Sequence, residues 1–432
     1  MRLLSGLTLS ICVLIFSSCK VNNSEPELLL RTNVFGETNP EHVESWVFLS
    51  NEKGEVITAK NIEEATSAEL SEFYGNSGET FTITRFSRAT FDQTDGQRIQ
   101  YALSTYQGVP VGSEFYLNEQ EEPQLEQYEV TGTAKVIING FDTTDEPFFA
   151  ASFSDDYSIF KTDQVYDSTK IVNGNYETVL TIRAQKLDIH VTTYLNNLPY
   201  YMVLEDVKPD TTIFKDISDF IPQQTVSLNK NVSGGYVYGY HQPRLLAHGN
   251  ELTSGAVWYY SNETDKQSPM NLGYIEGYNY YKVNYQSEGA LCCDNTVSFL
   301  WLDDHFPEDV QLPDYQFSII DRSVNNFSYM FDADYTYKEA YIYDQYDDGS
   351  LSWSVLSPNG MEIKFPEIPN KIKAEYPDMA EVFKDLQVYS LTFTHERTEP
   401  GYMNRLKFNL ERGPQPTRFD EFSYRFPLSE EM

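Results

Sequence analysis

Apolar and polar residues alternate with a period of two along much of the chain. The alternating stretches are rich in β-branched and aromatic residues, and Gly, Asn, Asp or Pro lies at their ends. A period of two places successive side chains on opposite faces of a strand, so each stretch predicts a β-strand. The clearest examples are residues 45–50, 80–86, 133–138, 178–182, 189–195, 236–240 and 388–393.

Turn sequences separate many of these stretches, at residues 52–54, 172–175, 347–349 and 358–360. Helical spacing is scarce. It occurs at residues 61–74 and 376–386, where apolar residues recur every three or four positions. Short strands joined by turns are typical of sandwiches. We therefore predict an all-β fold of tandem β-sandwich (Ig-like) modules with short capping helices.

Two acidic or Pro-containing stretches, residues 118–124 and 207–224, lack periodicity and are predicted to be linkers. They divide the chain into a β-sandwich module at 28–118, a second at 126–206 and a Tyr-rich β portion at 226–432. The last portion is long enough for two modules, dividing near 321–328.

The N-terminus carries a secretory signal. Arg2 precedes an apolar stretch at residues 3–16, which is too short to span a bilayer. The following Phe16-Ser17-Ser18-Cys19 resembles the lipobox of bacterial lipoproteins of the Bacteroidota type. The resemblance implies cleavage after residue 18, acylation of Cys19 and a tether at 19–27. It also implies that N-terminal acyl chains hold the protein on a membrane of the cell envelope. Lys20 is compatible with the outer membrane.

A second resemblance lies in the first module. Residues 45–60 read as a strand, a Gly turn and a return strand, and an aromatic strand follows at 80–86. This order is similar to that of carboxypeptidase-regulatory-like and related Ig-like domains. The resemblance implies a spacer or a binding domain.

Composition and charge exclude some partners. The chain has 31 Lys and Arg against 65 Asp and Glu, which gives a formal charge of −34. Proteins that bind nucleic acids or anionic lipid surfaces do so through surfaces rich in Lys and Arg, so no nucleic-acid partner is expected. Aromatic residues make up 15% of the chain and supply apolar area for packed cores.

The search for catalytic motifs finds no nucleophile elbow, phosphate loop or dinucleotide fingerprint. Asp303-Asp304-His305 could support acid–base work, but acidic neighbours are expected for any His in so acidic a chain. The acidic stretches 332–334 and 344–349 do not have the spacing of a calcium loop. We predict no catalytic residues, no metal site and no cofactor.

Cys292 and Cys293 are adjacent in the sequence. Adjacent Cα atoms lie about 3.8 Å apart, below the usual 4.4 Å minimum for a disulfide. The two cysteines therefore form either a strained bond or two thiols on opposite faces of a strand.

Tyrosines are the main candidates for binding. The chain has 32 of them, and several share one parity within a predicted strand, so their side chains are expected on one face. Such rows serve either as glycan or peptide platforms or as the half-buried face of a strand. The candidates are Tyr236, Tyr238 and Tyr240, Tyr335 with Tyr337, and Tyr341 with Tyr343.

These observations predict a non-enzymatic binding or assembly module at the cell surface, whose partner is a glycan or an envelope protein. Two alternatives stay open. One is a glycan-directed hydrolase with paired carboxylates, and the other is a calcium-stabilised adhesin module.

Overall fold

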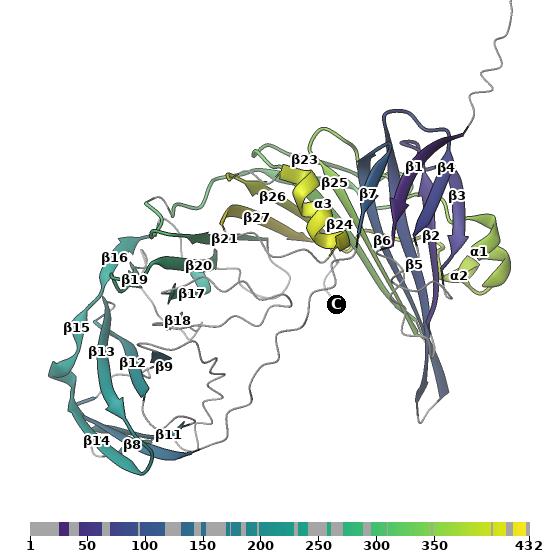
Figure 1. Ribbon diagram of the computed structural model, residues 1–432. Coiled ribbons are helices and arrows are strands. Elements are labelled where there is room, and N and C mark those ends of the chain that lie inside the picture. The colour runs from purple at the N-terminus through teal and green to yellow at the C-terminus, as the bar shows by residue number, and fades with distance from the viewer. Residues whose placement is uncertain are drawn as a thin grey trace, which may run out of the picture.

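The computed structural model describes a mainly β protein (Figure 1), which confirms the all-β prediction. The residues that it describes are 26–33, 43–62, 70–93, 96–116, 131–141, 148–152, 170–172, 174–182, 187–196, 198–228, 232–240, 257–260, 271–287, 295–308, 310–346, 349–398, 401–411 and 418–428. The signal segment, Cys19, residues 118–124, Cys292 and Cys293 lie outside them.

Twelve of the described strands form one sheet. Its order is β18 (Val257–Tyr260), β17 (Val232–Tyr240), β20 (Tyr280–Ser287), β21 (Thr296–Asp303), β27 (Phe419–Pro427), β26 (Ser390–Glu396), β24 (Tyr337–Tyr346), β25 (Gly349–Pro358), β6 (Gly96–Pro110), β5 (Thr80–Gln93), β2 (Val43–Ser50) and β3 (Val56–Asn61). Neighbours are antiparallel except β25 and β6, which pair in parallel. Strands from the predicted 28–118 module and from the 226–432 portion thus share one sheet.

The main core lies on one face of this sheet. Phe86, Tyr285, Trp353 and Phe393 belong to it and are all buried. The hairpin of β22 (Phe317–Asp321) and β23 (Ser328–Phe331) packs against it, as do α1 (Asn370–Glu375) and α2 (Met379–Val382). The predicted division near 321–328 therefore falls at the turn of a hairpin.

A three-stranded sheet covers the opposite face near β2 and β5. Its order is β4 (Ser71–Gly75), β1 (Glu27–Thr32) and β7 (Ser113–Phe115). Leu29, Leu30 and Phe73 from this sheet pack with Val47 and Ile83 into a second core. Helix α3 (Gly401–Glu411) contributes to the same core through the buried residues Tyr402, Leu406 and Leu410.

Residues 131–222 form two four-stranded sheets that share a third core (Figure 1). One has the order β10 (Lys170–Val172), β11 (Asn175–Ile182), β8 (Gly132–Asn139) and β14 (Thr211–Asp216), and the other β15 (Ile221–Pro222), β13 (Leu198–Val207), β12 (Leu187–Leu195) and β9 (Phe148–Ser152). The linker predicted at 207–224 is wrong. Strand β14 pairs in parallel with β8, and the short 3-10 helix η1 (Ile217–Asp219) leads into β15.

Three predicted turns are confirmed where the structure describes them. The turn at 358–360 follows β25, and its Gly360 has φ of +82°. Gly54, between β2 and β3, has φ of +87°, and Gly174, between β10 and β11, has φ of +80°. A side chain is strained in this left-handed region, so glycine suits all three turns. A further antiparallel pair, β16 (Gln224–Ser227) and β19 (Asn271–Tyr274), lies beside the large sheet.

The helix predicted at 61–74 is wrong at its C-terminal part. Residues 71–75 form β4, which pairs with β1, and Phe73 is buried by that pairing. The helix predicted at 376–386 is present only in part, because α2 spans four residues and α1 precedes it. In the described part of the chain, no helix is both long and apolar enough to cross a membrane.

Candidate functional site

Tyr341 and Tyr343 lie side by side on β24 and point away from the main core. Their neighbours Ala340 and Ile342 point into that core, so the alternation predicted from the sequence is observed. The ring of Tyr389 lies 6.4 Å from that of Tyr341 and 6.2 Å from that of Tyr343, in both cases edge-to-face. We call these three residues the tyrosine surface.

Small residues flank the tyrosine surface. Ser352 and Ser354 on β25 lie opposite Tyr343 and Tyr341, and Ser390 on β26 lies opposite Tyr341 on its other side. Tyr343 is 44% exposed, and Tyr341 is half-buried. Because serine side chains are short, the rings stand above their neighbours. The result is a surface of aromatic rings and hydroxyl groups.

The other predicted tyrosines are placed differently. Tyr335 and Tyr337 do not share a face, since Tyr335 packs against the main core and Tyr337 is buried in the second core. The reason is that β24 begins at Tyr337, so strand alternation does not extend back to Tyr335. Strand β17 is confirmed, but the side chains of Tyr236, Tyr238 and Tyr240 lie outside the description.

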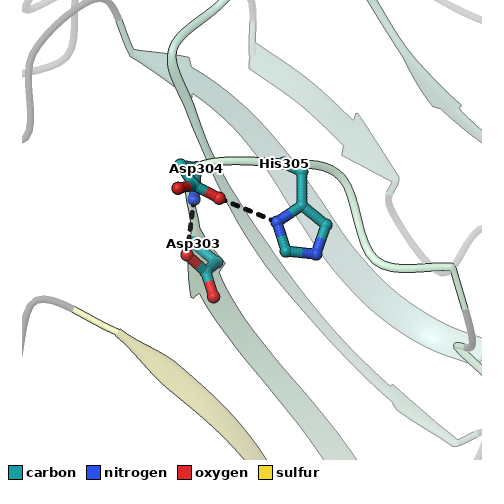
Figure 2. A group of neighbouring side chains, drawn as sticks. All are labelled: Asp303, Asp304 and His305. Atoms are coloured by element: carbon teal, nitrogen blue, oxygen red, sulfur yellow. Dashed lines mark hydrogen bonds and ion pairs between the residues drawn. The ribbon is translucent and has the colours of Figure 1, made fainter.

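Asp303, Asp304 and His305 form a compact group at the end of β21 (Figure 2). His305 Nδ1 lies 2.8 Å from Asp304 Oδ1, and the Asp304 amide donates to Asp303 Oδ1 at 2.7 Å. The contact with His305 is the largest of the effects that lower the pKa of Asp304. Arg418 pairs with Asp303 at 3.1 Å and with Asp304 at 3.0 Å. The Arg418 guanidinium pairs with both carboxylates and offsets part of their charge, so the group ties β21 to the start of β27.

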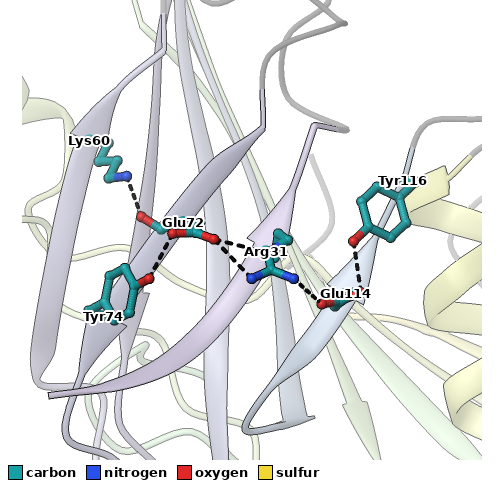
Figure 3. A network of polar contacts seen from close by, with 6 residues as sticks. All are labelled: Arg31, Lys60, Glu72, Tyr74, Glu114 and Tyr116. Atoms are coloured by element: carbon teal, nitrogen blue, oxygen red, sulfur yellow. Dashed lines mark hydrogen bonds and ion pairs between the residues drawn. The ribbon is translucent and has the colours of Figure 1, made fainter.

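A second polar network crosses the three-stranded sheet (Figure 3). Arg31 on β1 pairs with Glu72 on β4 at 3.0 Å and with Glu114 on β7 at 2.7 Å. The hydroxyl of Tyr74 donates to Glu72. This hydrogen bond and that from Arg31 lower the pKa of Glu72. All these groups are solvent-accessible, so we interpret the network as one that aligns three short strands.

The acidic stretch at 332–334 also has a local role. Asp332 Oδ1 accepts the Gln316 amide at 2.6 Å, beside the hairpin of β22 and β23. Asp347 and Asp348 lie outside the described residues. Among the residues that are described, the cluster at Asp303 is the sole group of three or more potential metal ligands.

Strand pairing creates a carboxylate pair that the sequence did not reveal. Glu396 on β26 and Glu421 on β27 lie directly opposite each other. Burial, and then the charge of Glu421, raises the pKa of Glu396 to about 7. Burial also raises the pKa of Glu421. The charge of Arg405 on α3 acts in the opposite direction and lowers the pKa of both carboxyl groups. The two residues are 25 positions apart, and only the register of β26 and β27 brings them together.

Comparison with protein families, with curated proteins and with solved structures finds no match to this chain. The functional argument therefore rests on the chain's own residues.

Proposed function

We propose that this protein is an acylated, envelope-anchored β protein that binds glycans through the tyrosine surface of Tyr341, Tyr343 and Tyr389. The observation that carries the proposal is the position of these rings, which lie on the face of β24 opposite the main core, with Tyr343 44% exposed. Sugar rings present apolar C–H faces and equatorial hydroxyl groups. Tyrosine offers both an apolar ring and a hydroxyl to such a ligand.

The formal charge of −34 supports a neutral ligand over an anionic one. The partly exposed serines at 352 and 354 add hydroxyl groups beside the rings. A glycan chain lying across β24 and β25 would meet rings and hydroxyls alternately.

The test is a glycan-array screen with the soluble chain from residue 20, followed by calorimetry on the best ligand. Tyr343→Ala should weaken binding roughly tenfold or more, as loss of an aromatic anchor does. Its free energy of unfolding should change by less than about 1 kcal/mol, because the side chain is exposed. Tyr74→Ala is the matched control, since Tyr74 is 49% exposed on a different sheet.

Equal glycan affinity in the wild type and Tyr343→Ala would show that the surface is not the binding site. Capture of an envelope protein in place of any glycan would overturn the ligand class.

We propose further that Cys19 carries the lipid anchor, on the strength of the lipobox resemblance. Wild-type protein expressed in a diderm bacterium should incorporate an alkyne-palmitate label and fractionate with membranes. Cys19→Ala should lose the label and retain the uncleaved signal, because the peptidase acts on the acylated cysteine. Cys12→Ala serves as the control. Absence of label from the wild type contradicts lipidation.

A further inference from the structure

A small pocket lies where β12, β17, β19 and β20 meet, remote from the tyrosine surface. Every residue that lines it is uncharged, and it holds about 10 Å³ of space, enough for one water-sized group. Strands β20 and β24 are separated by three other strands of the sheet. The pocket is therefore a site distinct from the one in the proposed function.

Three tyrosine rings form the walls of this pocket. The ring of Tyr281 is nearly perpendicular to that of Tyr274, at 88° and 6.0 Å, and to that of Tyr278, at 88° and 6.3 Å. Two of the three walls, Tyr281 and Tyr274, are held in place by further contacts. Tyr281 donates its hydroxyl hydrogen to the Ile275 carbonyl at 2.9 Å, and Phe306 stacks on Tyr274 at 3.9 Å. The three rings make a preformed aromatic corner.

One buried acceptor also lines the pocket. Gln223 is 8% exposed, and its Nε2 donates to the Tyr200 carbonyl at 3.3 Å. This bond fixes which end of the amide is the donor. Its Oε1 is buried and accepts no hydrogen bond from the described residues. A buried carbonyl without a hydrogen-bond partner is destabilising, so a ligand with a donor group would be stabilised here.

Two glycines make room for these groups. A Cβ on Gly273 would lie 2.2 Å from Gln223 Oε1, and a Cβ on Gly239 would lie 2.2 Å from the Tyr278 ring. Both distances are below any real contact. A side chain at either position would displace the acceptor or one wall, so the pocket depends on glycine at both.

We propose that this pocket binds a primary ammonium group at the end of an alkyl chain, as in the lysine side chain of a partner polypeptide. An ammonium is about the size of a water molecule, donates to Gln223 Oε1 and is attracted to the faces of aromatic rings. A trimethylammonium group is too large for 10 Å³ of space. A carboxylate would meet the faces of the tyrosine rings and the Gln223 Oε1 acceptor, both of which repel negative charge.

The surroundings favour a cation as well. Glu276 lies close enough to Tyr274 and Tyr281 to raise the pKa of both hydroxyls, although burial contributes more. The chain as a whole carries a formal charge of −34. A basic partner would thus be drawn to this protein before its lysine reaches the pocket.

The experiment titrates the full mature chain with n-butylammonium, n-butanol and tetramethylammonium at constant ionic strength, and follows binding by calorimetry. Butylammonium should bind at least tenfold more tightly than the other two. Nα-acetyl-lysine methylamide should match butylammonium and exceed glucosamine, because its ammonium ends a linear alkyl chain, whereas the amine of glucosamine is attached directly to a bulky sugar ring.

Variants assign the binding to this pocket. Gln223→Leu and Tyr278→Leu should each weaken butylammonium binding at least tenfold, whereas Tyr278→Phe keeps the ring face and should retain it. Gln100→Leu and Tyr74→Leu change exposed residues on other strands and should have no effect. Circular dichroism confirms that each variant is folded.

Equal binding of butanol and butylammonium, or unchanged amine affinity in both Gln223→Leu and Tyr278→Leu, would overturn the proposal. So would absence of binding at millimolar amine, which would leave the pocket as a site for water. None of these three results bears on glycan binding at the tyrosine surface, because Tyr343 is unaltered in all these variants.

Discussion

Lys338 on β24 is a charged side chain enclosed by aromatic rings. It is 3% exposed, and its Nζ donates to the Tyr335 hydroxyl at 3.3 Å. The same atom lies 5.3 Å from the centre of the Tyr335 ring and 5.7 Å from that of Tyr329. These contacts compensate only part of the cost of removing the charge from water. Burial therefore lowers the pKa of Lys338 to about 8.

This shift predicts a rise in stability at alkaline pH. The lysine pKa is 10.5 in the unfolded chain and about 8 in the folded protein, so between these values the folded protein binds fewer protons. The free energy of unfolding should therefore increase as the pH rises from 8 to 10.5. Lys338→Met should remove the part of this increase that comes from Lys338 and leave the part from Lys282, whose pKa burial also lowers to about 8. It should also stabilise the protein at pH 7 by about 2 kcal/mol.

Urea unfolding at pH 7, 8.5 and 10 measures both effects as differences between the wild type and the variant. Lys371→Met is the matched control, because Lys371 is exposed on α1. A wild-type protein that is more stable than Lys338→Met at pH 7 would show that the aromatic contacts outweigh the desolvation of the charge.

The tyrosines of β24 show which side-chain positions the sequence predicts and which it does not. The alternation around Tyr341 and Tyr343 correctly gave a shared face, because both lie within one strand. The same reasoning is wrong for Tyr335. This residue precedes β24, which begins at Tyr337, and side chains alternate between two faces only within a strand. Parity also does not say which face is covered. Tyr337 and Tyr343 lie on the same face of β24, yet Tyr337 is buried in the second core with residues of α3, whereas Tyr343 is exposed.

At the scale of elements, strands were easier to predict than helices. All seven quoted strand stretches lie in observed strands, except that β26 begins two residues later than expected. The stretch around Phe73 has helical spacing over a few residues, but pairing with β1 decides its conformation. Local propensity is weak compared with such tertiary pairing.

Helix α3 was missed for a related reason. Its buried residues Tyr402, Leu406 and Leu410 do recur every four positions, which is a helical signal. The surrounding sequence is so rich in aromatic and polar alternation that this short pattern did not stand out. The Glu396–Glu421 pair beneath it could not be predicted, because it depends on the register between two strands.

At the scale of the molecule, chain order and spatial order differ. The sequence suggested successive modules, yet the parallel pairing of β6 with β25 joins segments about 250 residues apart. Within that pairing Leu103 lies directly opposite Trp353, and both belong to the main core. No local pattern encodes a parallel pairing between distant strands. The two four-stranded sheets at 131–222 share a core of their own, built from residues such as Val136 and Val191.

This arrangement predicts that the two ends of the large sheet unfold together. In a variant whose sole tryptophan is Trp301, fluorescence reports on β21, far along the chain from β6. Leu103→Ala should nevertheless lower the Trp301 unfolding midpoint, with a loss of about 2–5 kcal/mol from the cavity that it leaves in the shared core. Thermal melts followed at the Trp301 emission measure this shift directly.

Val136→Ala provides the control, because Val136 is buried in the core of the 131–222 sheets and contributes nothing to the main core. It should lower the unfolding midpoint of those strands, as followed by circular dichroism. The midpoint followed at Trp301 should stay within about one degree of the wild-type value, as expected for distant, independent sites. A Trp301 midpoint that is insensitive to Leu103→Ala would mean that β6 and β25 separate before the rest of the sheet unfolds. In that case the N-terminal strands would behave as a module of their own, as the sequence pattern alone suggests.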